Sequence, residues 1–284
     1  MNPFIYKKSL EAFFIEDIGD RDVTSDVLFP KSAQGELTLI SKQSGVFCGE
    51  DVIVSGFEVL DPSVKVTTFV PDGASIASGV EIAKIQGPIR SLLKGERVIL
   101  NLIQRMSGIA TLTREAVQRL DDEKTMICDT RKTTPGLRTF EKYAVRAGGG
   151  KNHRFGLHDA VMIKDNHIAF AGSITRAAET IKSELGHMVK IEVETEHEDQ
   201  VKEAVEAGVD CIMFDNRSPE QVRVLKALVP SSITTEVSGG LSLDNLSSYR
   251  GLDVDYISLG CLTHSAPSLD ISAKVITNSE EDNK

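Results

Sequence analysis

The sequence has few of the features that mark secreted, zinc-binding or membrane-spanning proteins. It contains four widely spaced cysteines and no Cys-x-x-Cys pair, which argues against disulfides and against a zinc site. No segment approaches the roughly 20 apolar residues of a membrane span. The first residues, MNPFIYKKSLEAFF, lack the uninterrupted apolar stretch of a signal peptide. We therefore expect a cytoplasmic protein with no membrane partner.

Positive charge is also scarce. The 284 residues include 32 Lys and Arg against 42 Asp and Glu, for a formal net charge of −10. This balance argues against a sequence-independent nucleic-acid binder, which usually presents a basic face. The chain also lacks G-x-x-x-x-G-K-(S/T) and a strand-linked G-x-G-x-x-G, which disfavours a P-loop or a Rossmann site.

Two patterns divide the chain. Residues 1–107 combine an amphipathic start with strand-like runs separated by turn signals, which predicts a small α+β domain. A long helical pattern then covers residues 91–120. We predict an interruption of this pattern near Ser107 and Gly108 and place the domain boundary there. The tail NSEEDNK is expected to be disordered.

From residue 108 onward, helical segments alternate with six short apolar runs that end in polar or glycine residues. The runs are TMICDTRK, AVMIKDNH, VKIEVETE, CIMFDNRS, ITTEVSGG and YISLGCLTHS. The alternation predicts a parallel sheet, and in an α/β barrel the carboxyl ends of the strands line one mouth. We predict one polar pocket from the residues at those ends: Asp129, Arg131, Lys132, Lys164, Asp165, Asn166, Glu192, Glu194, Asp215, Asn216, Ser238, Gly239, Gly240, Gly260 and His264.

Residues 129–167 concentrate positive charge. They hold eight Lys or Arg and four acids, a net of +4, so the rest of the chain carries about −14. Arg131, Lys132 and Lys164 follow apolar strands, and cations that converge at a barrel mouth suit a polyanionic small molecule. Other cations fall in or just after a helix-like stretch and are expected on a solvated face: Lys142, Arg146 and Lys151.

Glycines and acids complete the predicted mouth. The last two strands end in SGGLS and LGCLTHS, where glycine lets the backbone approach an anion, so we predict a phosphate site. Glu194 and Asp215 end consecutive strands. They could hold a hydrated Mg²⁺ indirectly, accept hydrogen bonds from sugar hydroxyls or stabilise a developing oxocarbenium ion. Ion pairing with Arg131 or Lys164 is the purely structural alternative.

The segment 129–168 resembles the central signature of the quinolinate phosphoribosyltransferase family, the decarboxylating enzymes of NAD biosynthesis. It reads DTRKTTPGLRTFEKYAVRAGGGKNHRFGLHDAVMIKDNHI. The resemblance continues through FIEDIGDRDVTSD, GERVILNLIQRMSGIAT, IEVETE, AGVDCIMFDN, EVSGGLSLDNL and VDYISLGCLTHSAPSLDIS, and so covers essentially residues 11–275 in the same order.

The resemblance implies an α/β fold: an incomplete α/β barrel of the type II phosphoribosyltransferase kind, residues 108–267, and an α+β open sandwich domain. The sandwich is residues 1–107, completed by about 268–284. The neighbouring subunit closes the barrel mouth, so the expected assembly is a dimer, in some members built into a hexamer. The reaction joins quinolinate to phosphoribosyl pyrophosphate with Mg²⁺ and gives nicotinate mononucleotide, pyrophosphate and CO₂.

The resemblance also assigns residues. Quinolinate is bound by Arg131, His153, Arg154 and Lys164 with Thr130 beside them, and by Arg97 of the neighbouring subunit. The expected catalytic residues are Lys132, which contacts both substrates, and Glu194 and Asp215, which lie near the ribose and a Mg²⁺ held mainly through the substrate. The phosphate-binding turns are formed by Ser238, Gly239, Gly240, Leu259, Gly260, Cys261 and His264.

Two positions depart from the family pattern. Cys261 stands where relatives often carry another residue, so we expect only its backbone to matter. The segment GDRDVTS departs from the family pattern, which usually has a glycine before the aspartate, and this leaves any role of Asp22 and Thr24 open.

Three other hypotheses fit parts of the pattern. A phosphosugar aldolase could form a Schiff base at Lys164, although it leaves Arg97, Arg131 and Arg154 unexplained. A molybdenum-associated branch shares the TRK pattern and the barrel but lacks the KDNH that this chain has. A sensor of phosphorylated metabolites, without catalysis, is the third class.

Overall fold

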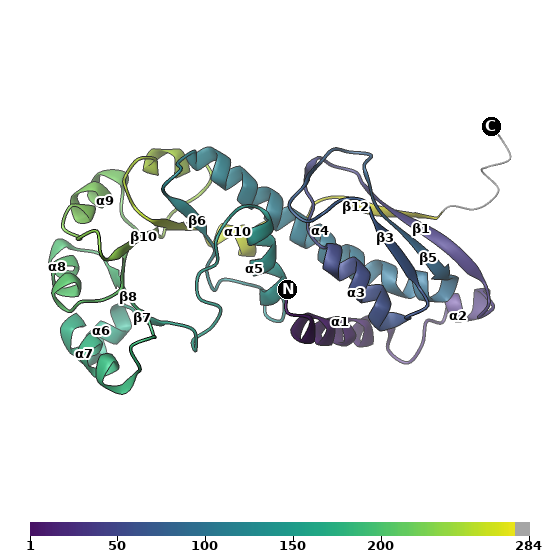
Figure 1. Cartoon of the computed structure of the whole chain (residues 1–284), viewed down its shortest axis with the longest axis horizontal. Helices are drawn as coiled ribbons and strands as arrows, with labels where there is room; N and C mark the ends of the chain where they lie inside the picture. Colours follow the sequence, from purple (N-terminus) through teal and green to yellow (C-terminus); the bar gives the residue numbers. More distant parts are fainter. Residues whose placement is uncertain (276–284) are drawn as a thin grey trace. The chain divides into compact units, whose positions relative to one another are not determined.

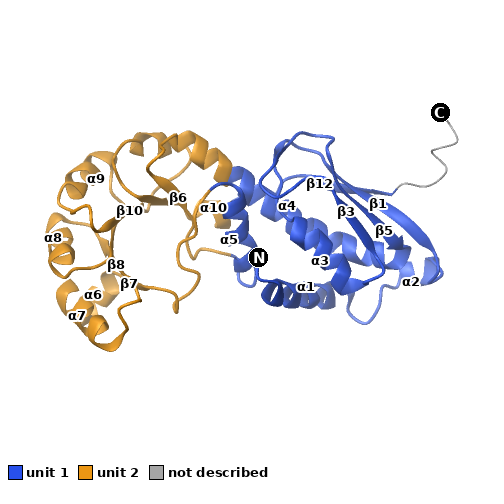
Figure 2. Ribbon diagram, in the orientation of Figure 1, with its two compact units in different colours: residues 1–112, 134–149, 266–284 blue, residues 113–133, 150–265 orange. Residues whose placement is uncertain are grey.

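The computed structural model describes residues 1–275. The NSEEDNK tail, for which we predict disorder, lies outside the described residues. The chain forms two compact units (Figure 2). Unit 1 contains residues 1–112, 134–149 and 266 onward, and unit 2 contains residues 113–133 and 150–265.

Unit 1 is built on a four-stranded antiparallel sheet with the order β12-β1-β5-β3. Its strands are β1 (Gln34–Ser41), β3 (Lys65–Thr68), β5 (Glu81–Pro88) and β12 (Ile271–Val275). A separate pair joins β2 (Gly45–Val46) to β4 (Ser75–Ile76). The helices are α1 (Pro3–Ile18), α2 (Ser25–Leu28), α3 (Glu50–Leu60), α5 (Arg138–Ala147) and the first part of α4 (Ile89–Leu120). The pairing of β12 with β1 adds the end of the described chain to the N-terminal sheet.

The interruption predicted in the long helix is wrong, because α4 runs unbroken through Ser107 and Gly108. A Cβ atom at Gly108 would lie 1.9 Å from the carbonyl oxygen of Pro267, so close packing and not a bend requires glycine there. The buried Ser107 hydroxyl accepts a hydrogen bond from the Cys48 amide at 3.0 Å. Despite the 32 residues of α4, none of the helices within residues 1–275 combines the length and hydropathy needed to cross a membrane.

Helix α5 buries charged side chains. Arg105 donates to Glu141, which is only 1% exposed, with 2.6 Å between Nη2 and Oε1. Lys142 is also fully buried, so the expectation of a solvated position is wrong for this residue. Arg146 and Lys151 are exposed, as expected. The local sequence pattern does not distinguish a solvated face from a buried group of charges. Arg105, which pairs with Glu141, lies on another helix, α4.

Unit 2 contains a parallel sheet of six strands with the order β6-β11-β10-β9-β8-β7 (Figure 1). The strands are β6 (Met126–Cys128), β7 (Val161–Ile163), β8 (Ile191–Thr195), β9 (Cys211–Asp215), β10 (Thr234–Ser238) and β11 (Tyr256–Ser258). Each falls in one of the six predicted runs. Within the described chain β6 and β7 are the two edges of this sheet, which confirms the incomplete barrel.

Helices alternate with the strands of unit 2. They are α6 (Asp165–Ala171), α7 (Ile174–Glu184), α8 (Glu198–Glu206), α9 (Pro219–Lys226), the 3₁₀ helix η1 (Leu246–Tyr249) and α10 (Cys261–His264). Of these, α6, α7, α8 and α9 lie on the outside of the curved sheet (Figure 1). Ser173 caps α7 by accepting from the Arg176 amide at 3.1 Å, and Ser218 caps α9 by accepting from the Gln221 amide at 3.4 Å. Such caps set where each helix begins: α7 directly after α6, and α9 shortly after the exit of β9.

Alternation along the strands separates an apolar face from a polar one. In β9, Ile212 and Phe214 are fully buried, whereas Met213 and Asp215 point to the other side. Strand β8 repeats the pattern, with Glu192 and Glu194 on the second face. The apolar face packs under the helices, so the polar face is left to line the inside of the barrel.

Candidate active site

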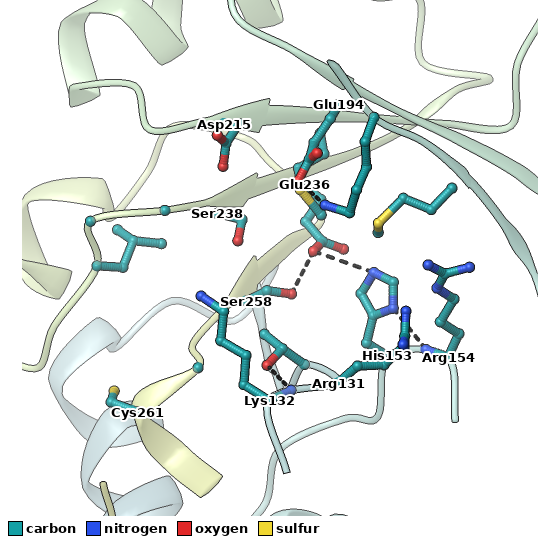
Figure 3. Close-up of a pocket in the computed structure, with 18 of the residues that line it drawn as sticks. Arg131, Lys132, His153, Arg154, Glu194, Asp215, Glu236, Ser238, Ser258 and Cys261 are labelled. Atoms are coloured by element: carbon teal, nitrogen blue, oxygen red, sulfur yellow. Dashed lines mark hydrogen bonds and ion pairs between the residues drawn. The ribbon is translucent and has the colours of Figure 1, made fainter. Parts of the chain in front are cut away.

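A cavity of about 510 Å³ opens at the carboxyl ends of the unit 2 strands. It gathers residues that are far apart in the sequence, from Thr130 to His264 (Figure 3). Most of the predicted site residues line it: Thr130, Arg131, Lys132, His153, Arg154, Lys164, Glu194, Asp215, Ser238, Gly239, Gly240, Gly260, Cys261 and His264. The parallel strands bring them together because every strand delivers its carboxyl end to the same mouth.

Seven predicted residues do not line this cavity. Five of them come from the predicted polar pocket, of which two are buried and three are exposed: Asp129 and Glu192, and Asp165, Asn166 and Asn216. The other two are Leu259 and Arg97. Leu259 is fully buried, and its amide donates to the Cys128 carbonyl at 2.9 Å. Leu259 therefore supports the strand exit from below. Arg97 is an exposed residue of α4 in unit 1.

Five lining residues were not predicted as site residues: Met162, Met213, Glu236, Leu241 and Ser258. For three of them, the sequence contained a pattern that predicts their position. Met213 and Glu236 each lie two positions before a predicted residue on the same strand, and Met162 lies two positions before Lys164, which directly follows β7. Side chains two apart on a strand share a face. The alternation that places Ser238 in the mouth therefore also places Glu236 one layer deeper.

Cations gather at one end of the cavity. Figure 3 shows Arg131, His153 and Arg154 together there, whereas Lys132, Ser238 and Cys261 lie toward the other end. The Arg154 guanidinium donates to the Ala160 carbonyl at 2.7 Å. Burial, and then the like charge of Arg131, lower the pKa of Arg154. Two guanidinium groups held near each other in this way favour binding of a ligand with more than one negative charge.

A buried aspartate holds the loop that carries His153 and Arg154. Asp129, which is fully buried at the end of β6, accepts hydrogen bonds from the Asn152 side chain at 2.6 Å and from the His153 amide at 2.8 Å. These bonds satisfy a buried carboxylate and orient an irregular segment. The GGGKNHR stretch is thus attached to the strand that delivers Arg131.

The acidic pair lies beside Lys164. The Lys164 Nζ and Glu194 Oε1 atoms are 2.5 Å apart, so the ion pair that the sequence analysis offered as the structural alternative does form with Glu194. Burial raises the pKa of Asp215, and the charge of Lys164 acts in the opposite direction. Both carboxylates therefore face the same cationic mouth in different electrostatic environments.

The far end of the cavity is formed by the turns that follow β10 and β11. Gly239 has φ +84°, and a Cβ atom there would lie 2.8 Å from the Asn216 amide nitrogen and 2.9 Å from Asp215 Oδ1. The backbone of this turn therefore lies directly against the Asp215 carboxylate. Burial raises the pKa of the Cys261 thiol, which keeps it protonated and argues against a role as nucleophile.

The donors in the mouth fit a magnesium ion bound through a substrate. Mg²⁺ prefers oxygen ligands and usually keeps several waters, with one or two carboxylates and substrate phosphates completing its shell. Glu194 and Asp215 supply two carboxylates of that kind. Among the described residues, His153, Glu192 and Glu236 form a group of three possible metal ligands. Its imidazole nitrogen suits metals such as zinc or iron better than Mg²⁺.

Comparisons with known proteins agree over the whole described chain. The C-terminal domain model of quinolinate phosphoribosyl transferase matches residues 109–274, and the N-terminal domain model matches residues 22–107. The probable nicotinate-nucleotide pyrophosphorylase (carboxylating) of Bacillus subtilis is 54% identical over 280 residues, covering 99% of this chain and 96% of the relative. The nicotinate-nucleotide pyrophosphorylase (carboxylating) of Rattus norvegicus is 39% identical over 250 residues, covering 86% and 83%.

Solved structures give the same result. The crystal structure of NadC from Streptococcus pyogenes matches with a TM-score of 0.93 and 41% identity, covering 98% of this chain and 99% of that one. The nicotinate-nucleotide pyrophosphorylase from Francisella tularensis matches with a TM-score of 0.90 and 33% identity, covering 97% and 98%. With both domain models matched in order and close relatives aligned along nearly its full length, the chain belongs to the quinolinate phosphoribosyltransferase family.

Proposed function

We propose that this chain transfers the phosphoribosyl group of phosphoribosyl pyrophosphate to quinolinate and releases pyrophosphate and CO₂, leaving nicotinate mononucleotide. The observation that carries the proposal is the division of one cavity into an arginine end and a glycine-turn end. Quinolinate has two carboxylates, and phosphoribosyl pyrophosphate has a phosphate and a pyrophosphate. Charge matching therefore requires two anion-binding regions in one pocket.

Quinolinate is assigned to the arginine end. Arg131 and Arg154 bind its carboxylates, and Lys164 and Thr130 complete the contact. The ring nitrogen already carries a free lone pair, so no general base is needed to create the nucleophile. The work of the pocket is to align that nitrogen with the ribose carbon and to stabilise charge.

Phosphoribosyl pyrophosphate is assigned to the other end. The turns at Ser238–Gly240 and at Gly260–His264 bind its phosphate groups, and Lys132 contacts both substrates. The Lys132 Cδ atom lies 3.0 Å from where a Cβ atom at Gly260 would be, which places this lysine beside the second turn. Lys132 stabilises the departing pyrophosphate, and Glu194 and Asp215 favour positive charge at the ribose.

Magnesium is proposed as the cofactor. Carried by the pyrophosphate near Glu194 and Asp215, Mg²⁺ supplies neutralisation of leaving-group charge when bound. The bond between the ribose carbon and the pyrophosphate oxygen breaks with its electron pair on oxygen, and the new bond forms from the ring nitrogen.

Loss of CO₂ follows from the product of that step. The coupled ring is a cationic pyridinium, which withdraws electrons from the carbon next to the nitrogen. The bond to the 2-carboxylate breaks, CO₂ leaves, and the electron pair stays on the ring carbon until a proton replaces the carboxylate. Lys164 and Arg154 position the ring for this step.

A shared site between subunits completes the proposal. Arg97 is exposed on unit 1, and we assign it to the quinolinate site of a neighbouring subunit in a dimer or in a hexamer built from such dimers. A third arginine would add to the cationic end that Arg131 and Arg154 begin. The cytoplasmic location expected from the sequence stays a prediction.

The aldolase hypothesis is not favoured. A Schiff-base lysine must lose its proton to attack a carbonyl, whereas Lys164 is held in an ion pair with Glu194 at 2.5 Å. The hypothesis also gives no function to Arg131 and Arg154, which line the same cavity as Lys164.

One assay tests the proposed function. The purified chain is supplied with quinolinate, phosphoribosyl pyrophosphate and Mg²⁺, and the release of pyrophosphate and of CO₂ from carboxyl-labelled quinolinate is followed. We expect both in equal amounts, only when both substrates are present, and not with Lys132→Ala. Absence of quinolinate-dependent pyrophosphate release from the folded wild-type chain would refute the proposal. Borohydride trapping of a phosphosugar on Lys164 would favour the aldolase instead.

A further inference from the structure

Both ring nitrogens of His153 are engaged by the protein. Nδ1 accepts a hydrogen bond from the Arg154 amide at 2.7 Å. Nε2 lies 3.1 Å from Glu192 Oε2 and 3.6 Å from Glu236 Oε1. A backbone amide can only donate, so Nδ1 is the nitrogen without a hydrogen and Nε2 carries the hydrogen toward the carboxylates. His153 therefore has no ring donor left for a substrate carboxylate.

The two glutamates come from below the mouth of the barrel. Glu192 on β8 is 8% exposed and Glu236 on β10 is 4% exposed, and both lie two residues before a mouth residue of the same strand. The Ser258 hydroxyl on β11 donates to Glu236 Oε1 at 2.5 Å, as drawn in Figure 3. Three strands thus contribute to one polar layer under the quinolinate end.

Burying two carboxylates in such a layer reduces the stability of the fold, so their presence calls for an explanation. The interior layers of α/β barrels are usually filled by branched apolar side chains. Two carboxylates in a buried space favour unfolding unless they are hydrogen-bonded or paired. Burial and the charge of Glu192 raise the pKa of Glu236, and His153 and Ser258 act against that rise, as expected of carboxyl groups that share a small buried space.

The polar layer is connected through His153 to the loop that carries Arg154. Arg154 lies in an irregular segment between α5 and β7, with its guanidinium bound to the Ala160 carbonyl at 2.7 Å. Its backbone amide is bound to the His153 ring, and the His153 amide is bound to Asp129 at 2.8 Å. The orientation of Arg154 therefore depends on the orientation of the imidazole, which depends on what Nε2 meets.

We infer that Glu192 and Glu236 are positioning residues for quinolinate binding, acting through the His153 imidazole to hold the backbone of Arg154 in its binding orientation. The inference rests on the proposed function and deepens it. It reassigns His153 from a group that contacts quinolinate to one that orients a group that does. Because positioning requires a hydrogen-bond acceptor and not a carboxylate as such, glutamine can replace either glutamate, whereas methionine, of similar length, cannot.

The test compares four variants, Glu192→Met, Glu192→Gln, Glu236→Met and Glu236→Gln, with the exposed control Glu206→Met on α8. We expect each site variant with methionine to raise the KM for quinolinate about tenfold while the KM for phosphoribosyl pyrophosphate changes by less than about twofold. The glutamine variants are expected within about threefold of wild type, and the control at wild-type values. A general loss of structure would change both KM values together and would not be rescued by glutamine.

Three outcomes would overturn the inference: an unchanged KM for quinolinate in the methionine variants, an equal rise in both KM values, or glutamine variants as impaired as the methionine ones. If the wild-type chain does not convert quinolinate at all, the proposed function itself fails, and the two failures are thereby distinguished.

A measurement on the wild-type chain covers the case in which a methionine variant does not fold. In ¹⁵N-histidine NMR spectra, with the His153 resonances assigned by their loss in His153→Asn, we expect a protonated Nε2 and an unprotonated Nδ1. A protonated Nδ1 would refute the chain of contacts from which the inference is drawn, whatever the activity.

Discussion

At the scale of single residues, the cations of this acidic chain divide into three kinds. Some face the cavity, as Arg131 and Arg154 do. Others are exposed away from the cavity, as Arg146 is, and Lys142 is buried within unit 1. The strand exits and the family resemblance identify the first kind from the sequence, but local sequence does not separate the other two, because Lys142 and Arg146 lie on the same helix, α5. Only the first kind is expected to affect substrate binding.

Replacing Arg131 tests that division directly. We expect Arg131→Ala to weaken quinolinate binding by about 2 kcal/mol, since the charge-assisted hydrogen bonds between the guanidinium and a carboxylate are lost. Titration calorimetry measures the affinity, with Arg146→Ala on the exposed side of α5 as the matched control. Unchanged quinolinate affinity in Arg131→Ala would remove this residue from the site.

Glu236 predicts a pH dependence of stability. Burial first, and then the charge of Glu192, raise its pKa from 4.5 to about 7. The folded chain thus holds this proton more tightly than the unfolded chain. Ionisation of Glu236 therefore reduces stability as pH rises between those two values. Glu236→Gln cannot ionise, so it does not lose this stability as pH rises. We expect the free energy of unfolding of the variant, measured by urea titration, to rise relative to that of the wild type between about pH 5 and pH 8, by at most a few kcal/mol.

The comparison uses the change with pH and not the absolute stability of the variant, because the substitution also alters packing. A difference between variant and wild type that stays constant over this interval would contradict the raised pKa. Glu206→Gln, an exposed substitution on α8, provides the control for general effects of removing one charge.

At the scale of elements, strand alternation and turn geometry build the site. A β-strand that ends at the mouth contributes a mouth residue and, two positions earlier, a residue in the layer below, as Ser238 and Glu236 show on β10. The turn that follows β10 then reverses direction through two glycines with positive φ. The strand supplies side chains, and the turn supplies backbone for an anion.

Gly239→Ala tests the turn. Alanine at φ +84° is strained by about 1–2 kcal/mol, and its Cβ atom would also meet the Asn216 amide nitrogen at 2.8 Å. We expect reduced thermal stability together with a raised KM for phosphoribosyl pyrophosphate. Gly251→Ala is the matched control, because Gly251 has φ +69° but nothing within 4 Å of its Cβ position. Equal effects of the two substitutions on KM would show that strain alone, and not the position of this turn, is responsible.

At the scale of the whole molecule, the proposed reaction requires more than one chain. The described cavity is lined by residues of unit 2, whereas Arg97 belongs to unit 1. If Arg97 serves the neighbouring subunit, one dimer contains two sites that each combine residues of both chains. Loss of Arg97 in one chain and loss of Lys132 in the other would then damage the same site and leave the second site intact.

Mixing Arg97→Ala with Lys132→Ala protein tests this arrangement. Each variant alone is expected to be nearly inactive, and after subunit exchange the mixture should recover about one quarter of wild-type activity, since half of the dimers are mixed and each has one intact site. A mixture of Arg131→Ala and Lys132→Ala is the matched control, because every site then lacks one of the two residues. No recovery in the first mixture, after exchange has been confirmed, would argue against a shared site.

The sequence by itself determined the six strands and most of the mouth, because apolar alternation and strand exits are local properties, and its resemblance to the family implied the incomplete barrel. The tertiary structure decided the rest through contacts between distant residues. Gly108 reads as a helix break until Pro267 is seen against it, and Glu236 reads as an ordinary strand residue until the imidazole of His153 is found beside it. Burial and hydrogen bonding of these residues depend on partners from other strands and loops, and no local pattern contains those partners.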